Sequence, residues 1–151
     1  MYNHYQSDYP NQVHQLLVTV SKHLFIGAKG QIRHQWKQMD VSLKTLHKSD
    51  REHLIHYFLR DHFSGVYYVE LVSSKQMIPL QDFLLRAWME RSDLRFAGIP
   101  TALMIPKAVE DYFPSAATIL NELGVQMIYP PSGFASGIRD LPVWEEISEL
   151  V

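Results

Sequence analysis

The chain contains no cysteine. Disulfide bonds are therefore excluded, as are metal centres and nucleophilic sites built on cysteine, and a zinc ion could be held only by histidines and carboxylates. The lack of cysteine also makes the cytoplasm the expected location.

Long apolar runs and excess positive charge are missing as well. No window approaches the roughly 18 apolar residues that a membrane span needs, and the N-terminus has neither the basic region nor the apolar run of a signal peptide. We therefore expect a soluble protein that is not exported and has no membrane partner. The net charge of -2 gives no overall attraction to phosphate, which counts against strong autonomous binding to DNA.

What the chain does have is enough apolar material for one core, because 46% of its 151 residues are hydrophobic. Residues 1–33 are predicted to form an N-terminal arm and a candidate helix that starts at Gln12. The β-branched residues of that segment leave a strand open as the alternative. Residues 34–151 are predicted to form the globular domain.

Within this domain the pattern predicts three strands first, followed by alternating helices and strands. Pro79 lies near the first turn of the first helix, and Gly124 closes the second. We therefore expect an α/β fold with a mixed five-stranded sheet, three strands antiparallel, flanked by helices. The predicted strands span 34–43, 53–63, 65–72, 98–106 and 125–129, and the predicted helices span 77–93, 114–124 and 141–151.

The first predicted strand places a carboxylate among apolar neighbours. Met39, Val41 and Leu43 share one face of an extended segment, and Asp40 lies on the other face. From the residues alone, Asp40 is most simply an exposed carboxylate on the polar face of an amphipathic strand.

The succession of phrases along the chain adds a second interpretation. A tryptophan shortly before Asp40, the hairpin phrase around 56–71, and the long stretch 98–140 resemble, in this order, the catalytic core of retroviral integrases and bacterial DDE transposases. The likeness covers roughly residues 34 to 150. It implies a ribonuclease-H-like fold and an ancestral activity in DNA integration or transposition.

The resemblance also implies three acidic residues that hold Mg²⁺ or Mn²⁺ for phosphoryl transfer. Asp40 matches the first acid. The second is expected directly after the apolar strand, where this chain has Pro106 or Lys107. Glu110 and Asp111 follow a few residues later and are candidate substitutes, although their simpler role is solvated charge.

Asp140 stands where the third acid is expected, and it is shorter by one methylene than the glutamate of the family. It could equally cap the final helix, since Asp is favoured at that position. One acid is thus kept, one replaced and one shortened, which predicts a degenerate site. Under this interpretation the metal ligands, where a metal binds at all, would be Asp40 and Asp140.

Three functions follow as hypotheses. The first is an integrase-core-like domain, no longer catalytic, that binds DNA or forms a homodimer, with Lys37, Lys107 and Arg139 as candidate DNA contacts. The second is an active Mg²⁺- or Mn²⁺-dependent polynucleotidyl transferase or nuclease. The third is a protein-interaction scaffold, because a fold does not determine a function.

Overall fold

A strand of 14 residues, β1 (Val13–Ile26), lies in the middle of the sheet and pairs with three other strands. The protein is represented here by a computed structural model, which describes residues 8–89 and 98–130. The remaining elements are β2 (Ile32–His34), the short 3-10 helix η1 (Leu46–Lys48), β3 (Glu52–Asp61), β4 (Tyr67–Ser73), α1 (Leu80–Trp88), β5 (Ala102–Met104), α2 (Lys107–Tyr112), α3 (Ala116–Glu122) and β6 (Gln126–Ile128).

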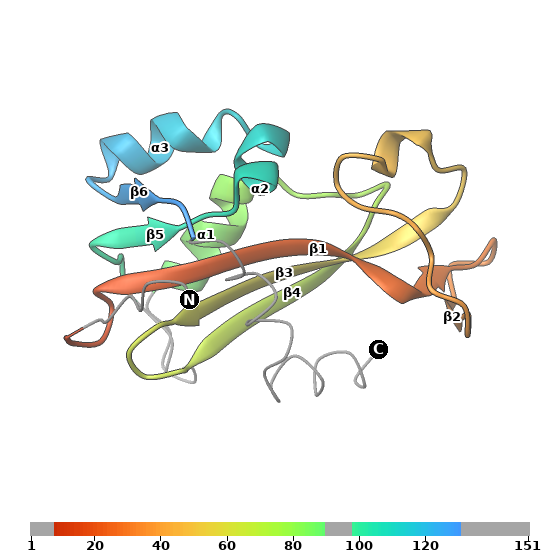
Figure 1. Cartoon of the computed structure of the whole chain (residues 1–151), viewed down its shortest axis with the longest axis horizontal. Coiled ribbons are helices and arrows are strands. Elements are labelled where there is room, and N and C mark those ends of the chain that lie inside the picture. The colour runs from red at the N-terminus through yellow and green to blue at the C-terminus, as the bar shows by residue number, and fades with distance from the viewer. Residues whose placement is uncertain (1–7, 90–97, 131–151) are drawn as a thin grey trace.

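The sheet is mixed and open. β3 runs antiparallel to β1, and β4 runs antiparallel to β3. On the other edge of β1, β5 runs parallel to it and β6 runs parallel to β5. The order is β4-β3-β1-β5-β6, with β2 paired to the far end of β1, as Figure 1 shows. The fold is therefore α/β with helices flanking the sheet, as expected, but the sheet has six strands rather than five.

The predicted helix from Gln12 is wrong, and the open alternative of a strand is what the structure has. Every residue from Val13 to Leu24 is buried or half-buried, so both faces of β1 are covered there. A strand covered on both faces shows no alternation of apolar and polar residues. Its apolar positions therefore also fitted a helical spacing.

The predicted strand 34–43 is also wrong. Only Ile32–His34 pairs with β1, and the segment after it is irregular up to η1. Met39, Val41 and Leu43 are buried while Asp40 is exposed, so the alternation is real. It arises because an extended segment lies over the core, not because the segment joins the sheet.

Most later elements agree with the predictions. The strands at 53–63 and 65–72, the helices at 77–93 and 114–124, and the strands at 98–106 and 125–129 all appear, each somewhat shorter than predicted. The segment Lys107–Tyr112, between the predicted strand 98–106 and the predicted helix 114–124, forms the additional helix α2. The predicted helix 141–151 lies outside the described residues. No helix in residues 8–89 and 98–130 is long and apolar enough to cross a membrane.

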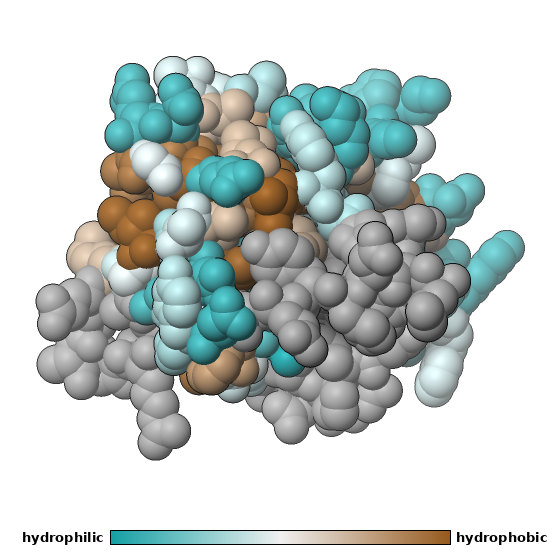
Figure 2. Space-filling model, turned by 60° about the vertical axis from the view of Figure 1, so that its left-hand side comes forward, coloured by the Kyte–Doolittle hydropathy of each residue, from teal (hydrophilic) through white to brown (hydrophobic). Residues whose placement is uncertain are grey.

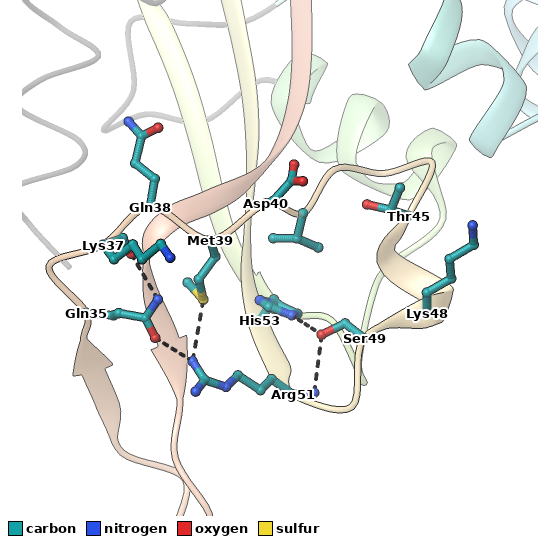
Figure 3. A pocket seen from close by; sticks show the side chains of 11 residues that line it. Gln35, Lys37, Gln38, Met39, Asp40, Thr45, Lys48, Ser49, Arg51 and His53 are labelled. Atoms are coloured by element: carbon teal, nitrogen blue, oxygen red, sulfur yellow. Dashed lines mark hydrogen bonds between the residues drawn. The ribbon is translucent and has the colours of Figure 1, made fainter.

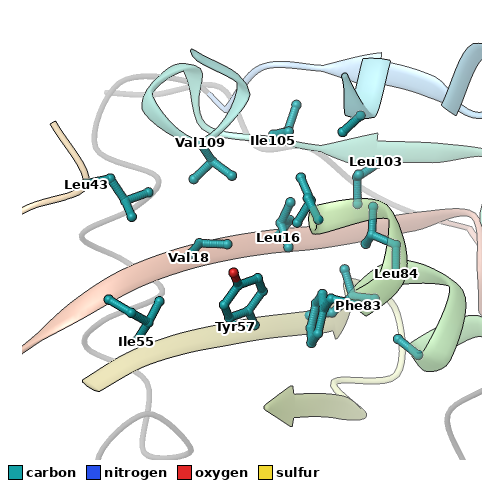
Figure 4. Packing of buried hydrophobic residues seen from close by; sticks show 14 of the residues in the cluster. Leu16, Val18, Leu43, Ile55, Tyr57, Phe83, Leu84, Leu103, Ile105 and Val109 are labelled. Atoms are coloured by element: carbon teal, nitrogen blue, oxygen red, sulfur yellow. The ribbon is translucent and has the colours of Figure 1, made fainter. Parts of the chain in front are cut away.

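One face of the sheet carries the main core, shown in Figure 4. Leu16 and Val18 of β1 and Tyr57 of β3 pack against Phe83 of α1, with the rings of Tyr57 and Phe83 5.3 Å apart. The Tyr57 hydroxyl donates a hydrogen bond of 2.8 Å to the carbonyl of Ile78 just before α1. The core thus fixes α1 to the sheet through both apolar and polar contacts.

The hairpin between β3 and β4 is closed by a buried carboxylate. Asp61 accepts hydrogen bonds from the Ser64 amide and hydroxyl, at 3.2 and 2.6 Å, and from the Asn11 amide at 3.1 Å. Gly65 follows with a φ of 77°, which favours glycine. The phrase that resembles the integrase hairpin therefore has a structural role in this chain.

A buried histidine joins the start of β1 to the end of α1. The Trp88 indole nitrogen donates a hydrogen bond of 3.0 Å to His14 Nδ1. Because Nδ1 accepts, the ring proton is on Nε2, which lies 2.9 Å from Asn11 Oδ1. Burial lowers the pKa of His14 to about 4, against an opposing effect of Asp61.

We expect the free energy of unfolding to fall as the pH is lowered from 7 to 4. Folded His14 stays neutral down to about pH 4, whereas in the unfolded chain it takes up a proton near pH 6.5, so the unfolded state binds more protons in this window. The loss should approach about 3 kcal/mol for this residue. Urea unfolding at a series of pH values measures it.

Burial lowers the pKa of His56 to about 4 as well, so a single variant should reduce the slope without abolishing it. In His14→Gln the dependence on pH should be shallower than in the parent. An equal slope in both proteins would contradict the role assigned to His14.

Candidate functional site

A crevice of about 240 Å³ opens where β1 and the segment after β5 meet. Ligands of open α/β sheets commonly bind at the carboxyl ends of the parallel strands, which makes this crevice the first position to examine. Its lining comes from three parts of the chain: Leu17, Val18, Thr19 and Lys22 of β1; Val41, Ser42, Leu43 and Lys44 of the segment before η1; and Pro106, Ala108 and Val109 after β5.

No carboxylate lines this crevice. β1 is the first long strand of the chain, and it contains neither Asp nor Glu between Val13 and Ile26. Val18 shares the crevice face of β1 with Val41, Leu43 and Val109, with which it packs in the main core, and Pro106 follows β5 by two residues. The two positions from which strand carboxylates could reach a common ion are therefore apolar.

The segment from Met39 to Leu43, which we call the covering segment, is held to β1 by two hydrogen bonds. The Met39 amide donates to the carbonyl of Lys22 at 2.8 Å, and the Lys22 ammonium donates to the carbonyl of Val41 at 3.1 Å. Val41 and Leu43 are buried in the main core as a result. The segment predicted to carry the catalytic strand instead forms one wall of the crevice.

The predicted acids that the structure describes lie on separate segments of the chain. Asp40 is exposed and lies in the irregular segment, where it lines a different cleft. Glu110 and Asp111 lie on α2, and their carboxylates are 3.8 and 3.4 Å from the Lys107 ammonium. Asp140 lies outside the described residues.

These residues do not suit a divalent cation. Mg²⁺ and Mn²⁺ take oxygen ligands, whereas the crevice offers the ammonium groups of Lys22 and Lys44. In the part of the chain that the structure describes, no group of three or more His, Asp or Glu side chains could hold a metal ion. We therefore derive no catalytic step through a metal.

A second and larger cleft, of about 640 Å³, lies between the end of the β1–β2 hairpin and η1, and Figure 3 shows it from close by. We call it the basic cleft. Three basic side chains, Lys37, Lys48 and Arg51, line it, and all three are exposed. Asp40 is its one acidic residue. The other lining residues are Gln35, Gln38, Met39, Val41, Thr45, Ser49 and His53.

Arg51 is held in place at the mouth of this cleft. Its guanidinium donates a hydrogen bond of 2.7 Å to Gln35 Oε1 and lies 4.7 Å from the centre of the Phe25 ring. Figure 3 shows Gln35 and Met39 converging on it, whereas the Asp40 carboxylate points away. The positive charge of Arg51 is therefore oriented but not neutralised by Asp40.

His53 lies at the floor of the cleft, 2.5 Å from the Ser49 hydroxyl. Burial lowers its pKa, and the neighbouring Arg51 charge lowers it further. His53 is therefore a neutral hydrogen-bonding group at pH 7. The positive character of the cleft comes from its lysines and arginine.

The candidate DNA contacts separate into different environments. Lys37 lines the basic cleft, with no ion pair to any described residue. The Lys107 charge is balanced by Asp111 and Glu110, which raise its pKa. Arg139 lies outside the described residues. Arg51, which was not among the candidates from the sequence, is a further cation of this cleft.

No protein-family model matches this chain, and no curated protein sequence matches it. The likeness to integrases therefore rests on the phrases of the sequence and on the order of the elements.

We expect Mg²⁺ or Mn²⁺ at millimolar concentration to change the melting temperature equally in the parent and in Asp40→Asn. Asp40 is exposed and belongs to no group of three or more His, Asp or Glu side chains in the described residues that could hold a metal ion, so its removal should abolish no ion site. Thermal unfolding with cation, and with EDTA as the reference, measures this. A rise in the parent that disappears in Asp40→Asn would show that this carboxylate binds a cation.

Proposed function

We propose that this chain is a ribonuclease-H-like domain, related to the catalytic cores of integrases and transposases, that binds DNA without cutting or joining it. The order of its sheet supports the first part. Three antiparallel strands come first in the chain, with β1 central, and two strands parallel to β1 follow on its other edge.

The observation that carries the absence of catalysis is the lining of the crevice beside β1. A two-metal mechanism needs carboxylates at the reacting phosphate, and on the crevice side Val18 and Pro106 stand where β1 and the segment after β5 would supply them. The covering segment from Met39 to Leu43 further fills this side of the sheet with buried apolar side chains.

DNA binding is supported by the basic cleft. Phosphate contacts are made mainly by Lys and Arg side chains, with amide and hydroxyl groups as further donors. The cleft offers three exposed cationic side chains beside Gln35, Gln38, Thr45 and Ser49. This local concentration of charge explains how a chain with a net charge of -2 could bind a polyanion.

The first test compares Lys37→Gln with Lys107→Gln in binding to a fluorescent DNA duplex. Affinity should fall steeply with salt, and Lys37→Gln should weaken binding and reduce the salt slope by about one. Lys107→Gln is the matched control, because Asp111 and Glu110 already balance its charge. Fluorescence anisotropy at several salt concentrations measures both. Absence of salt-dependent binding, or a larger loss in Lys107→Gln, would contradict the proposal.

Self-association is a second candidate function, favoured by apolar side chains at one end of the molecule. Ile99 precedes β5 and Leu123 precedes β6. Because these strands are parallel, both residues lie beside the N-terminal ends of the two strands. Met89 lies near them, since the Gly98 amide bonds the carbonyl of Trp88. All three are exposed, and Figure 2 shows hydrophobic residues gathered toward the end that carries β5, β6 and α3.

If this surface pairs two copies of the chain, Ile99→Ser combined with Leu123→Ser should shift the protein from dimer to monomer. Loss of the buried apolar area would remove the driving force for association. Sedimentation velocity measures the state, and Leu71→Ser on β4, also exposed, is the control. A parent that sediments as a monomer at every concentration would rule out this second role.

A further inference from the structure

Three aromatic rings form a row on the surface of the β1–β2 hairpin. The rings of His23 and His34 stack with their centres 5.8 Å apart and an interplanar angle of 16°. The ring of Trp36 meets His34 edge to face, with centres 5.2 Å apart. We call His23, His34 and Trp36 the aromatic row.

The backbone holds this row in place. His34 pairs with Leu24 across the hairpin, and the Gln35 amide donates a hydrogen bond of 2.8 Å to the carbonyl of His23. The ring nitrogen Nδ1 of His23 lies 3.0 Å from the carbonyl of Gln35. The residue before Trp36 is thus fixed to β1, so the indole projects from a defined backbone position.

The indole itself is almost fully open to water, with 90% of its surface exposed. Trp side chains are usually highly buried, so a tryptophan fixed at its backbone and exposed at its ring needs a reason. A flat aromatic face next to positive charge is the arrangement that stacks on nucleic-acid bases.

The positive charge around the row is unbalanced. Seven of the 14 Lys and Arg residues of the chain lie between residues 22 and 51, against two of the 16 Asp and Glu residues. In residues 8–89 and 98–130, the ion pairs involve Lys75, Arg86 and Lys107, and none involves these seven. Their charges remain available to phosphate groups.

The row and the basic cleft are adjacent. Gln35 and Lys37, the two chain neighbours of Trp36, both line the cleft. Figure 3 shows the Gln35 side chain between Lys37 and Arg51: it accepts a hydrogen bond from the guanidinium of Arg51 and donates one to the carbonyl of Lys37. A base stacked on Trp36 would therefore bring its backbone phosphates toward Lys37 and Arg51.

This geometry distinguishes single strands from duplexes. In a duplex each base face is already stacked on its neighbours, so an exposed indole has no face to contact without unstacking a step. In a single strand the base faces are accessible, and each stacking contact contributes about 1–3 kcal/mol.

We propose that the aromatic row and the basic cleft together form a binding site for single-stranded DNA, with Trp36 as the base-stacking residue and Lys37, Lys48 and Arg51 as the phosphate contacts. This inference rests on the proposed function of DNA binding and adds to it the form of the DNA and the surface that binds it.

The test measures anisotropy of a labelled 20-nucleotide oligo-dT and of a 20-base-pair duplex, with the full chain and three variants. The parent should bind the single strand more tightly than the duplex, and Trp36→Ala should weaken single-strand binding at least about fivefold with little change in salt slope. Trp36→Phe should recover part of the loss. Phe63→Ala is the matched control, because Phe63 is also exposed. It follows the end of β3, where the His62 amide donates a hydrogen bond to the carbonyl of Val13, the first residue of β1. The β1–β2 hairpin lies at the other end of β1.

A second readout does not depend on the alanine variant. Stacking should quench the fluorescence of Trp36 on addition of oligo-dT, and this quenching should be lost in Trp36→Phe, leaving only the signal of the other tryptophans. Trp36 is so exposed that its replacement should leave the melting temperature nearly unchanged.

Each outcome decides between the two proposals. Binding of duplex as tightly as single strand, or equal affinities in the parent and in Trp36→Ala, would overturn the single-strand site while leaving DNA binding in place. Absence of binding to either DNA would overturn the proposed function and this inference together.

Discussion

The pairing of β1 along both of its edges is the constraint on which the rest of the structure depends. Its first residues pair with β5 on one side and with β3 on the other, so their backbone groups are satisfied within the sheet. The side chains on one face then meet α1, α2 and α3 in the main core. A shift of β1 by one residue would move these side chains to the opposite face.

Both candidate sites follow from the path of β1. The crevice forms where β1 continues past the end of β5, and the basic cleft forms where β1 leaves the core and pairs with β2. The segment between β2 and η1 separates the two hollows. Its buried residues Met39, Val41 and Leu43 face the core, while Lys37 and Asp40 stay exposed at the cleft.

The helices α1 and α3 were predicted correctly because each has one exposed face or clear terminal residues. In α1 the buried residues Leu80, Phe83, Leu84 and Ala87 follow a helical period, and Gly124 ends α3 with a φ of 76°. β1 was predicted wrongly because its burial on both faces erased the period of two. Segment 34–43 was predicted wrongly because extended loops over a core show that same period.

The site was predictable only in part. The basic character of the first third could be counted from the letters, and Lys37 does line the basic cleft. The apolar lining of the crevice at Val18 could not be found, because a valine in an apolar strand gives no signal without the sheet order that places it at the crevice. The neutralisation of Lys107 by α2 likewise depends on a helix that the sequence did not indicate.

One detail of β1 has a mechanical consequence. Between Val20 and Phe25 the strand advances five residues while β3 moves back only from Ile55 to His53, so the ladder is interrupted. Ser21 fills the interruption by accepting a hydrogen bond from the Leu24 amide at 3.0 Å. An irregularity of this kind bends a strand and increases its local twist. The outer part of β1, which carries the hairpin and pairs with β3 again at Phe25 and Ile26, therefore takes its direction from this interruption.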